Sequence, residues 1–152
     1  VLSSRGLGDV YKRQTGGGLG RLAKTLKKFK PDFVLIELGG NDALRGYSIK
    51  LIKSNLEKMI ALIKQNKSKV LLMQIRIPPN YGQKYMLAFE KIYKDLALSE
   101  EVYLIPFMLE EIGINSDLMQ PDGIHPNKKA QSLIAKDVKK NIDKFLLINQ
   151  SN

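Results

Sequence analysis

The chain has 152 residues, the size of one compact domain. Its 43% hydrophobic content supplies enough apolar side chains for a core and excludes wholesale disorder. The absence of cysteine excludes disulfides and thiolate chemistry, and no apolar run approaches the roughly 20 residues of a membrane span. The net charge of +10 leaves one further class open, a basic module that binds anions or nucleic acid.

The first 14 residues differ in kind from the rest. Residues 4–14 read Ser-Arg-Gly-Leu-Gly-Asp-Val-Tyr-Lys-Arg-Gln, the translation of one frame of a common transposon-type sequencing adapter. We therefore expect residues 1–14 to be adapter-derived and residues 15–152 to be a partial domain, with a genuine basic arm as the alternative. Leaving out the charges of residues 1–14 lowers the net charge from +10 to +8.

From Thr15 onward, segments with helical periodicity alternate with short apolar runs. The expected elements are a helix at 18–29, a strand at 32–38, a helix at 48–66, a strand at 69–77, a helix at 83–98, a strand at 102–107 and a helix at 128–147. Such alternation predicts parallel strands joined by right-handed crossovers, hence an α/β three-layer sandwich.

The last helix is expected to begin after Asn127, a good N-cap residue. Its apolar residues recur at helical spacing, which predicts one buried face. The residues of that face are Ala130, Leu133, Ile134, Val138, Ile142 and Phe145.

Two polar segments lie where parallel sheets build their sites, beyond strand C-termini and in a late loop. Gly39-Gly40-Asn41-Asp42 follows the first strand, and the Asn41 amide can donate to a developing oxyanion. Asp122 precedes His125, the only histidine, by three residues. A carboxylate that reaches the imidazole Nδ1–H fixes its tautomer and stabilises the imidazolium. An ordinary turn and a surface histidine are the alternatives.

A nucleophile is missing from this set. The chain has nine serines, and none lies in a Gly-x-Ser-x-Gly elbow or at the end of a predicted strand. Gly8-Asp9-Val10 has valine where a Gly-Asp-Ser block would have its serine, and it lies in the adapter-like segment.

Four motifs, in order, carry a family resemblance: 39–46 (GGNDALRG), 72–78 (LMQIRIP), 80–82 (NYG) and 122–127 (DGIHPN). Over residues 15–147 the chain resembles the SGNH (GDSL-type) hydrolases, and within them the bacterial thioesterase I, arylesterase and lysophospholipase group. The resemblance implies a flavodoxin-like parallel sheet, with the first two strands of the family fold missing from this chain.

The resemblance also implies a serine esterase that cleaves acyl esters or thioesters, such as lysophospholipids, acyl-CoA or aryl esters, without metal or cofactor. Asp122 and His125 then correspond to the acid and base of a Ser-His-Asp triad, and Asn41 to an oxyanion-hole donor. The family's nucleophilic serine and second donor, a glycine, are expected before Thr15. The chain as given is therefore expected to be inactive.

Four further residues, Gly40, Leu44, Ile77 and Tyr81, are expected at the substrate, with local packing as the alternative for the three larger side chains. The resemblance implies that the intact protein is a monomer in the periplasm or outside the cell. Its partner is then a small acyl ester or thioester, with no nucleic acid.

A metallophosphoesterase is the enzymatic alternative. It would use as ligands Asn41, Asp42, Asp122 and His125, because carboxylates and imidazole bind metals. A single histidine makes that set poor.

Overall fold

The computed structural model describes residues 14–107 and 109–150, and the chain divides into two compact units, residues 1–104 and 105–152. Each unit is described by itself. Apart from Gln14, the segment expected to be adapter-derived lies outside the described residues.

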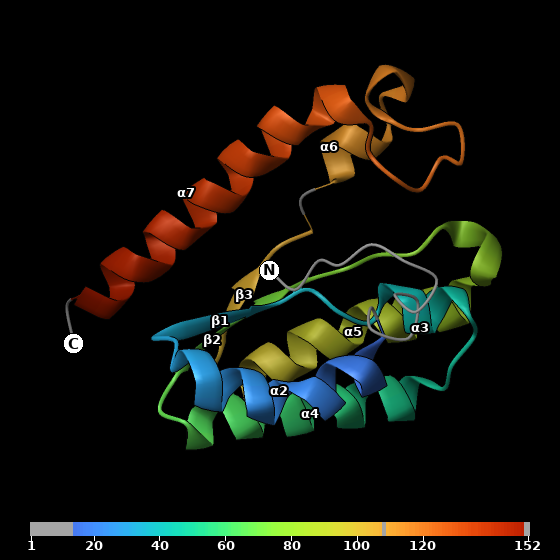
Figure 1. Ribbon diagram of the computed structural model, residues 1–152. Helices are drawn as coiled ribbons and strands as arrows, with labels where there is room; N and C mark the ends of the chain where they lie inside the picture. The colour runs from blue at the N-terminus through green and yellow to red at the C-terminus, as the bar shows by residue number, and fades with distance from the viewer. Residues whose placement is uncertain (1–13, 108, 151–152) are drawn as a thin grey trace. The chain divides into compact units, whose positions relative to one another are not determined.

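The first unit contains three helices of 15 to 17 residues and a parallel sheet (Figure 1). Its elements are α2 (Thr15–Phe29), β1 (Phe33–Ile36), α3 (Gly40–Leu44), α4 (Ile49–Gln65), β2 (Lys69–Met73), a 3-10 turn (Pro79–Tyr81), α5 (Gln83–Ser99) and β3 (Tyr103–Ile105), whose last residue begins the second unit. The sheet order is β1-β2-β3, and β1 runs parallel to β2 with Phe33 opposite Lys69. The predicted α/β class with a parallel sheet is confirmed.

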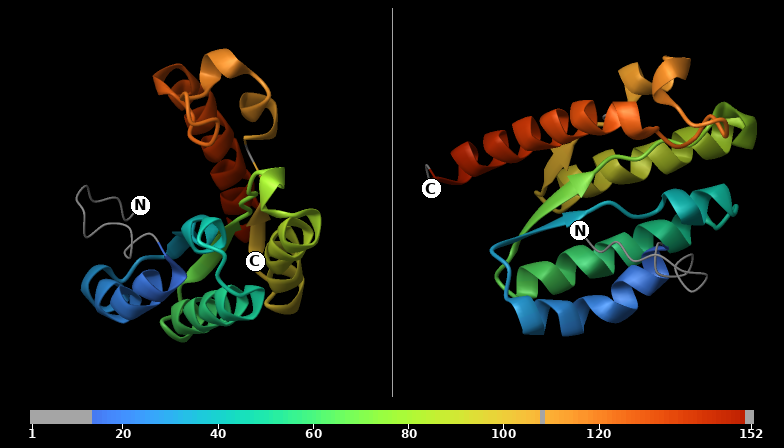
Figure 2. Two further views of the ribbon diagram at one scale, coloured as in Figure 1. Left: turned by 90° about the vertical axis from the view of Figure 1, so that its right-hand side faces the viewer. Right: turned by 45° about the horizontal axis from the view of Figure 1, so that its top comes forward.

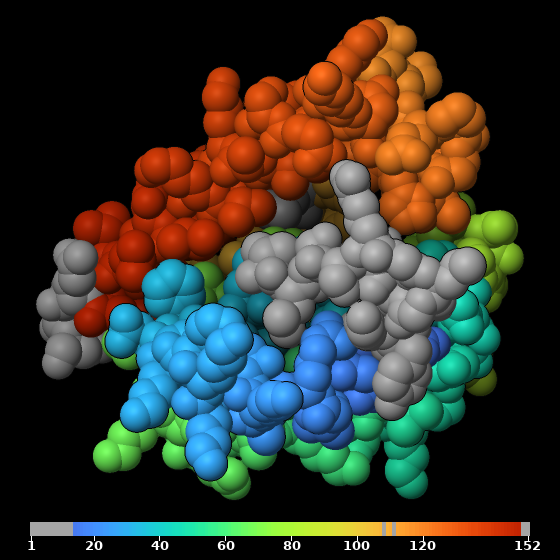
Figure 3. Space-filling model, viewed as in Figure 1, coloured from blue at the N-terminus to red at the C-terminus, as the bar shows by residue number. Residues whose placement is uncertain are grey.

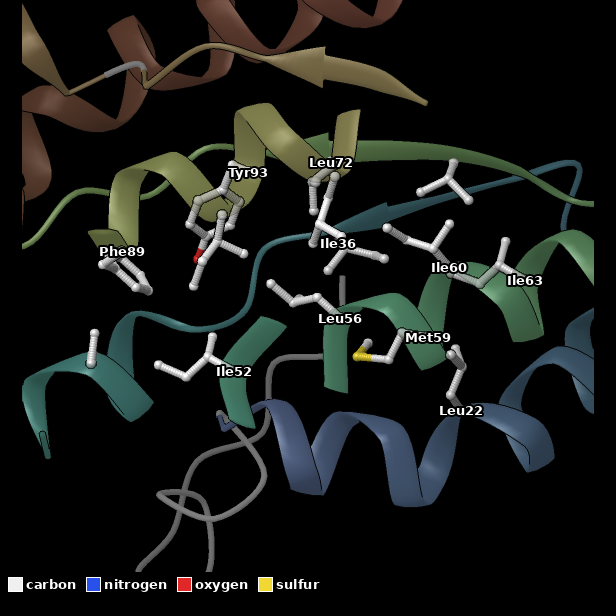
Figure 4. Packing of buried hydrophobic residues seen from close by; sticks show 14 of the residues in the cluster. Leu22, Ile36, Ile52, Leu56, Met59, Ile60, Ile63, Leu72, Phe89 and Tyr93 are labelled. Atoms are coloured by element: carbon white, nitrogen blue, oxygen red, sulfur yellow. The ribbon is translucent and has the colours of Figure 1, made fainter. Parts of the chain in front are cut away.

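The core of this unit lies between the sheet and its helices. α4 packs against α2 and α5, and the two views of Figure 2 show α2 and α4 side by side. Figure 4 shows side chains of α4 facing Ile36 of β1 and Leu72 of β2. The predicted stripe of α4 is fully buried: Ile52, Leu56, Met59, Ile60 and Ile63. Each such side chain stabilises the fold by roughly 1.5–3 kcal/mol.

The strands are shorter than predicted. β1 ends at Ile36 rather than residue 38, β2 at Met73 rather than 77, and β3 covers 103–105 rather than 102–107. The apolar runs extend beyond the ends of the strands because an apolar residue can be buried without pairing to a neighbouring strand. Ile77 shows this, since it is only 5% exposed and belongs to the core, yet lies outside any strand.

The second unit consists of α6 (Glu110–Gly113), 3-10 turns at Ser116–Leu118 and Lys128–Ala130, and α7 (Gln131–Gln150). The last helix begins later than predicted, at Gln131 rather than residue 128. Asn127 is an N-cap, but of the 3-10 turn that precedes this helix, where its side chain accepts a hydrogen bond from the Lys129 N–H at 2.8 Å. No helix in the described part of the chain has the length and apolarity to cross a bilayer.

The predicted buried face of the last helix is partly wrong. Ala130 and Phe145 are buried, and Ile134, Val138 and Ile142 are half-buried. Leu133 is 44% exposed, because it borders an open hollow of about 760 Å³ within this unit.

Candidate active site

The loop that carries Asp122 and His125 is built around the Asp122 carboxylate. Its Oδ2 lies 2.7 Å from the His125 Nδ1, and its Oδ1 accepts from the backbone N–H groups of Ile124 and His125, both at 2.9 Å. Gly123, at φ +65°, supplies the left-handed backbone that this turn needs. The predicted Asp–His contact is therefore present, and the carboxylate holds the histidine by both ring and backbone.

Asn127 fixes the same loop from its far end. Its amide donates to the carbonyls of Asp117 at 2.7 Å and Met119 at 3.1 Å, while its Oδ1 caps the next turn. The chain also pairs across the loop, where the Gln120 N–H donates to the His125 carbonyl at 2.7 Å. The sequence predicted Asn127 only as a helix cap, because the other two bonds join residues that no periodicity connects.

His125 is arranged to accept a proton. Asp122 engages Nδ1, whereas Nε2 has no hydrogen-bond partner among the described residues. Both side chains are exposed to solvent. In this arrangement Nδ1–H stays fixed on the carboxylate, and Nε2 is the nitrogen available as a general base.

The hydrogen bonds to Asp122 lower the pKa of its carboxyl from 3.8 to about 2. The largest cause is the His125 backbone N–H, followed by the His125 ring and the Ile124 N–H. Because the folded pKa lies below the unfolded value, the carboxylate stabilises the loop above pH about 4. That stabilisation is lost as the pH falls through about 2.

We expect a carboxyl ¹³C NMR titration of Asp122 to have its midpoint near pH 2. His125→Ala removes the ring but keeps both backbone donors, so the pKa of Asp122 should rise only part of the way to 3.8. A midpoint at 3.8 in the unmodified chain would contradict the hydrogen bonding described above.

Asn41 lies in the first turn of the short helix α3. Gly39 begins that helix in a left-handed conformation, at φ +118°. The half-buried Asn41 side chain makes no hydrogen bond to any residue that the structure describes, so its amide N–H groups are available to a ligand. The alternative of an ordinary turn does not describe this segment, because Gly39 is an N-cap and Gly40 to Asp42 form the first turn of α3.

The sequence offered Asp42 only as a possible metal ligand and missed its structural role. Its buried carboxylate accepts from the Thr15 backbone N–H at 2.9 Å and from the Thr15 Oγ1 at 2.8 Å. The Asn55 amide in turn donates to Thr15 Oγ1 at 3.0 Å. The carboxylate thus satisfies the first N–H of α2 and lies at the positive end of that helix, while it anchors the residue next to Asn41.

A close approach behind Gly39 holds the same segment. The Tyr93 hydroxyl donates to the Leu38 carbonyl at 2.9 Å, and a Cβ at Gly39 would lie only 2.5 Å from that hydroxyl. Burial first, and then the charge of Asp42, raises the pKa of Tyr93 well above 10, so the phenol is a neutral donor.

The expected substrate contacts occupy different environments within the first unit. Gly40 packs beneath Ile75, which a Cβ would approach to 3.3 Å. Leu44 ends α3 half-buried against the core, and Tyr81 is exposed in its 3-10 turn. Ile77 is part of the core, which fits the packing alternative.

The structure brings together Asp122 with His125 in one unit, and Gly40, Asn41 and Asp42 in the other. Among the described residues, no group of three or more His, Cys, Asp and Glu side chains could hold a metal ion. Asp42 is buried and each of its carboxylate oxygens accepts a hydrogen bond from Thr15, which disfavours it as a ligand in the metallophosphoesterase alternative.

Comparison with known proteins gives close relatives. The sequence matches the GDSL-like Lipase/Acylhydrolase family over residues 7–133. It is 48% identical over 139 residues to an arylesterase of Vibrio mimicus, covering 91% of this chain and 70% of that protein. It is 47% identical over 118 residues to thioesterase 1/protease 1/lysophospholipase L1 of Escherichia coli (strain K12), covering 78% of this chain and 57% of that protein.

A solved structure agrees. The psychrotrophic esterase EstA of Pseudoalteromonas sp. is similar with a TM-score of 0.85 at 40% identity, over 88% of this chain and 73% of that one. Fold, site motifs and relatives together define a class, the α/β ester hydrolases. Within that class, the chain belongs to the GDSL-like lipase/acylhydrolase family, the SGNH hydrolases. The matched range begins inside residues 1–14, whose adapter origin stays a prediction.

Proposed function

We propose that the complete domain is a serine esterase or thioesterase that hydrolyses small acyl esters. The carrying observation is the 2.7 Å contact between Asp122 Oδ2 and His125 Nδ1, which leaves Nε2 without a partner among the described residues. Support comes from relatives named arylesterase and thioesterase 1/protease 1/lysophospholipase L1. Export from the cytoplasm and a monomeric state stay predictions.

The proposed mechanism assigns one role to Asn41 and to Asp122, and uses His125 alternately as base and acid. His125 Nε2 takes the proton of the serine hydroxyl as the serine oxygen attacks the acyl carbonyl carbon. Asn41 donates to the tetrahedral oxyanion, a contribution typically of roughly 3–4 kcal/mol. His125 then gives the proton to the leaving alcohol or thiol, and water repeats the sequence to release the acid. Asp122 stays ionised and stabilises the imidazolium throughout.

The nucleophile in this proposal is none of the nine serines of the chain. Two of them already have structural roles: Ser48 caps α4 by accepting from the Leu51 N–H at 3.2 Å, and buried Ser68 donates to the Pro31 carbonyl at 2.7 Å. The proposal therefore places the attacking serine in a segment that this chain does not supply. Leu44 and Tyr81 are proposed as acyl contacts.

A phosphonate ester probe tests the proposal, since EstA has been solved as a complex inhibited by monoethylphosphonate. We expect the 152-residue chain to remain unlabelled by a fluorophosphonate in intact-mass spectrometry. Residues 15–152 fused behind the N-terminal part of the Vibrio mimicus arylesterase should be labelled at one serine and should hydrolyse aryl esters.

In that fusion, His125→Ala should abolish labelling, and Asn41→Ala should lower kcat by roughly 10²–10³. Lys139→Ala, on the exposed side of α7, serves as the matched control and should leave both unchanged. Stoichiometric labelling of a serine in the unfused chain would overturn the assignment of the nucleophile. A folded fusion that is labelled equally with and without His125 would overturn the role of the histidine.

A further inference from the structure

One end of the first unit carries a concentration of positive charge around an exposed phenyl ring. We call this the basic tip and define it by Lys24, Lys27, Lys28, Phe29, Lys30 and Lys67, all exposed. Phe29 is 64% exposed, although it is a large apolar side chain. Figure 3 shows the end of α2 in light blue on the visible face of the molecule.

Backbone and side-chain bonds join the two chain segments of the tip. The Ser68 hydroxyl donates to the Pro31 carbonyl at 2.7 Å, and the Lys69 N–H donates to the Asp32 carbonyl at 2.9 Å. These bonds hold the turn that contains Lys67 against the end of α2. Asp32 is the only acidic residue in residues 24–33 and 64–69, and Glu100, after the end of α5, pairs with Lys64 beside the tip at 3.4 Å. The lysines of the tip outnumber these carboxylates, so its net charge is positive.

The helix itself accounts for part of this pattern. Lys27 and Lys28 lie in the last turn of α2, where cations interact favourably with the helix dipole. Lys30 is the C-cap of α2 and Lys67 follows the C-cap of α4, so the helix dipoles account in part for these two lysines as well. The dipoles do not account for an exposed phenylalanine among the lysines.

We infer that the basic tip docks on an anionic lipid surface, with Phe29 inserted between the headgroups and the lysines facing the lipid phosphates. Each lysine near such a surface contributes to binding, and an apolar ring among them adds burial at the interface. The Lys28 Nζ lies 5.0 Å from the Phe29 ring centroid, over one of its faces. Single-stranded nucleic acid is bound through several aromatic rings on which successive bases stack, whereas the tip as defined here has the one ring of Phe29, which favours lipid.

The tip lies at the opposite end of the strands from the candidate site residues of this unit. β1 begins at Phe33 and β2 at Lys69, whereas Gly39 to Asp42 follow the far end of β1. Docking at the tip therefore leaves the Asn41 end of this unit uncovered. Lipid binding does not require ester hydrolysis, so the inference stands or fails apart from the proposed function.

The chain contains no tryptophan, which permits a direct test. In Phe29→Trp, the single tryptophan should shift its emission to the blue with vesicles containing roughly 30% phosphatidylglycerol, and brominated acyl chains should quench it. Neither change should occur with pure phosphatidylcholine vesicles. The matched reporter is Leu87→Trp in the first half of α5, at the other end of the unit. Leu87 is 53% exposed in the native chain, and the reporter should show no shift.

Co-sedimentation with the same vesicles tests the charges. Replacing Lys27, Lys30 and Lys67 by Gln should weaken binding roughly a hundredfold, about fivefold per lysine. The control replaces three other exposed lysines, Lys58, Lys84 and Lys94, and has the same net charge. Far-UV circular dichroism confirms that each variant is folded.

Three results would overturn the inference. Equal loss in the two lysine variants would show that net charge alone is responsible. Equal binding to neutral and anionic vesicles would remove the role of the lysines. Binding of single-stranded DNA in preference to vesicles, with quenching rather than a blue shift, would assign the tip to nucleic acid.

Discussion

Gly39→Ala should destabilise the first unit by roughly 2–6 kcal/mol. A non-glycine residue at φ +118° costs of order 1–3 kcal/mol in backbone strain. The added Cβ would also lie 2.5 Å from the Tyr93 hydroxyl, and overpacking of a buried site typically costs about another 1–3 kcal/mol. The free energy of unfolding, measured by urea denaturation, gives this difference directly.

A second substitution identifies the clash as the cause. Tyr93→Phe removes the hydroxyl and leaves the Leu38 carbonyl without its donor, which should cost about 1–2 kcal/mol by itself. In the Tyr93→Phe background, the nearest remaining atoms to the new Cβ are those of Ile52 and Phe89, at 3.5 and 3.6 Å. Gly39→Ala should then lower the free energy of unfolding only by the cost of backbone strain. The two substitutions should therefore couple by at least about 1 kcal/mol.

Gly46→Ala is the matched control. Gly46 also has a positive φ, +70°, but nothing lies within 4 Å of its added Cβ. We expect Gly46→Ala to lower the free energy of unfolding by the cost of backbone strain alone, and to show no coupling with Tyr93→Phe. Additive effects of Gly39→Ala and Tyr93→Phe would show that the hydroxyl is not what excludes a side chain at position 39.

The sequence predicts those parts of the fold that depend on local periodicity. The apolar stripe from Ile52 to Ile63 specifies a helix with one buried face, and the run Phe33 to Ile36 specifies a strand, although only Ile36 of that strand is buried. The end of ladder pairing is not local, because it depends on where the neighbouring strand stops. Ile77 is apolar and buried for a reason unrelated to strand pairing, so the pattern extends the strand too far.

The same distinction applies to the candidate site. Asp122 and His125 are three residues apart, and the glycine between them permits the turn, so their contact follows from spacing. Asp42 contacts Thr15 across 27 positions, and Thr15 contacts Asn55 across 40. No period or motif joins such residues, since the packing of α2 on α4 brings them together. The hydrogen bonds among Asp42, Thr15 and Asn55 therefore could not be predicted from the sequence alone.

Asp42→Ala should destabilise the first unit by roughly 2–5 kcal/mol, because it leaves the buried N–H and hydroxyl of Thr15 without an acceptor. The Thr15 N–H is the more specific probe. It is the first amide of α2, and a first-turn N–H has no partner within its own helix. We expect the hydrogen bond to Asp42 to slow the exchange of this amide, so the substitution should raise its exchange rate.

Thr25→Val is the matched control for Thr15→Val in the same helix. The Thr25 hydroxyl donates only to the Arg21 carbonyl one turn back, so its loss should cost under about 1 kcal/mol. Thr15→Val removes a donor to Asp42 and an acceptor for Asn55 together, and should cost about 2 kcal/mol. If both valine variants were equally stable, or if Thr15 exchange were unchanged in Asp42→Ala, the carboxylate would not tie α3 to α2. Asn41 would then depend on α3 alone for its position.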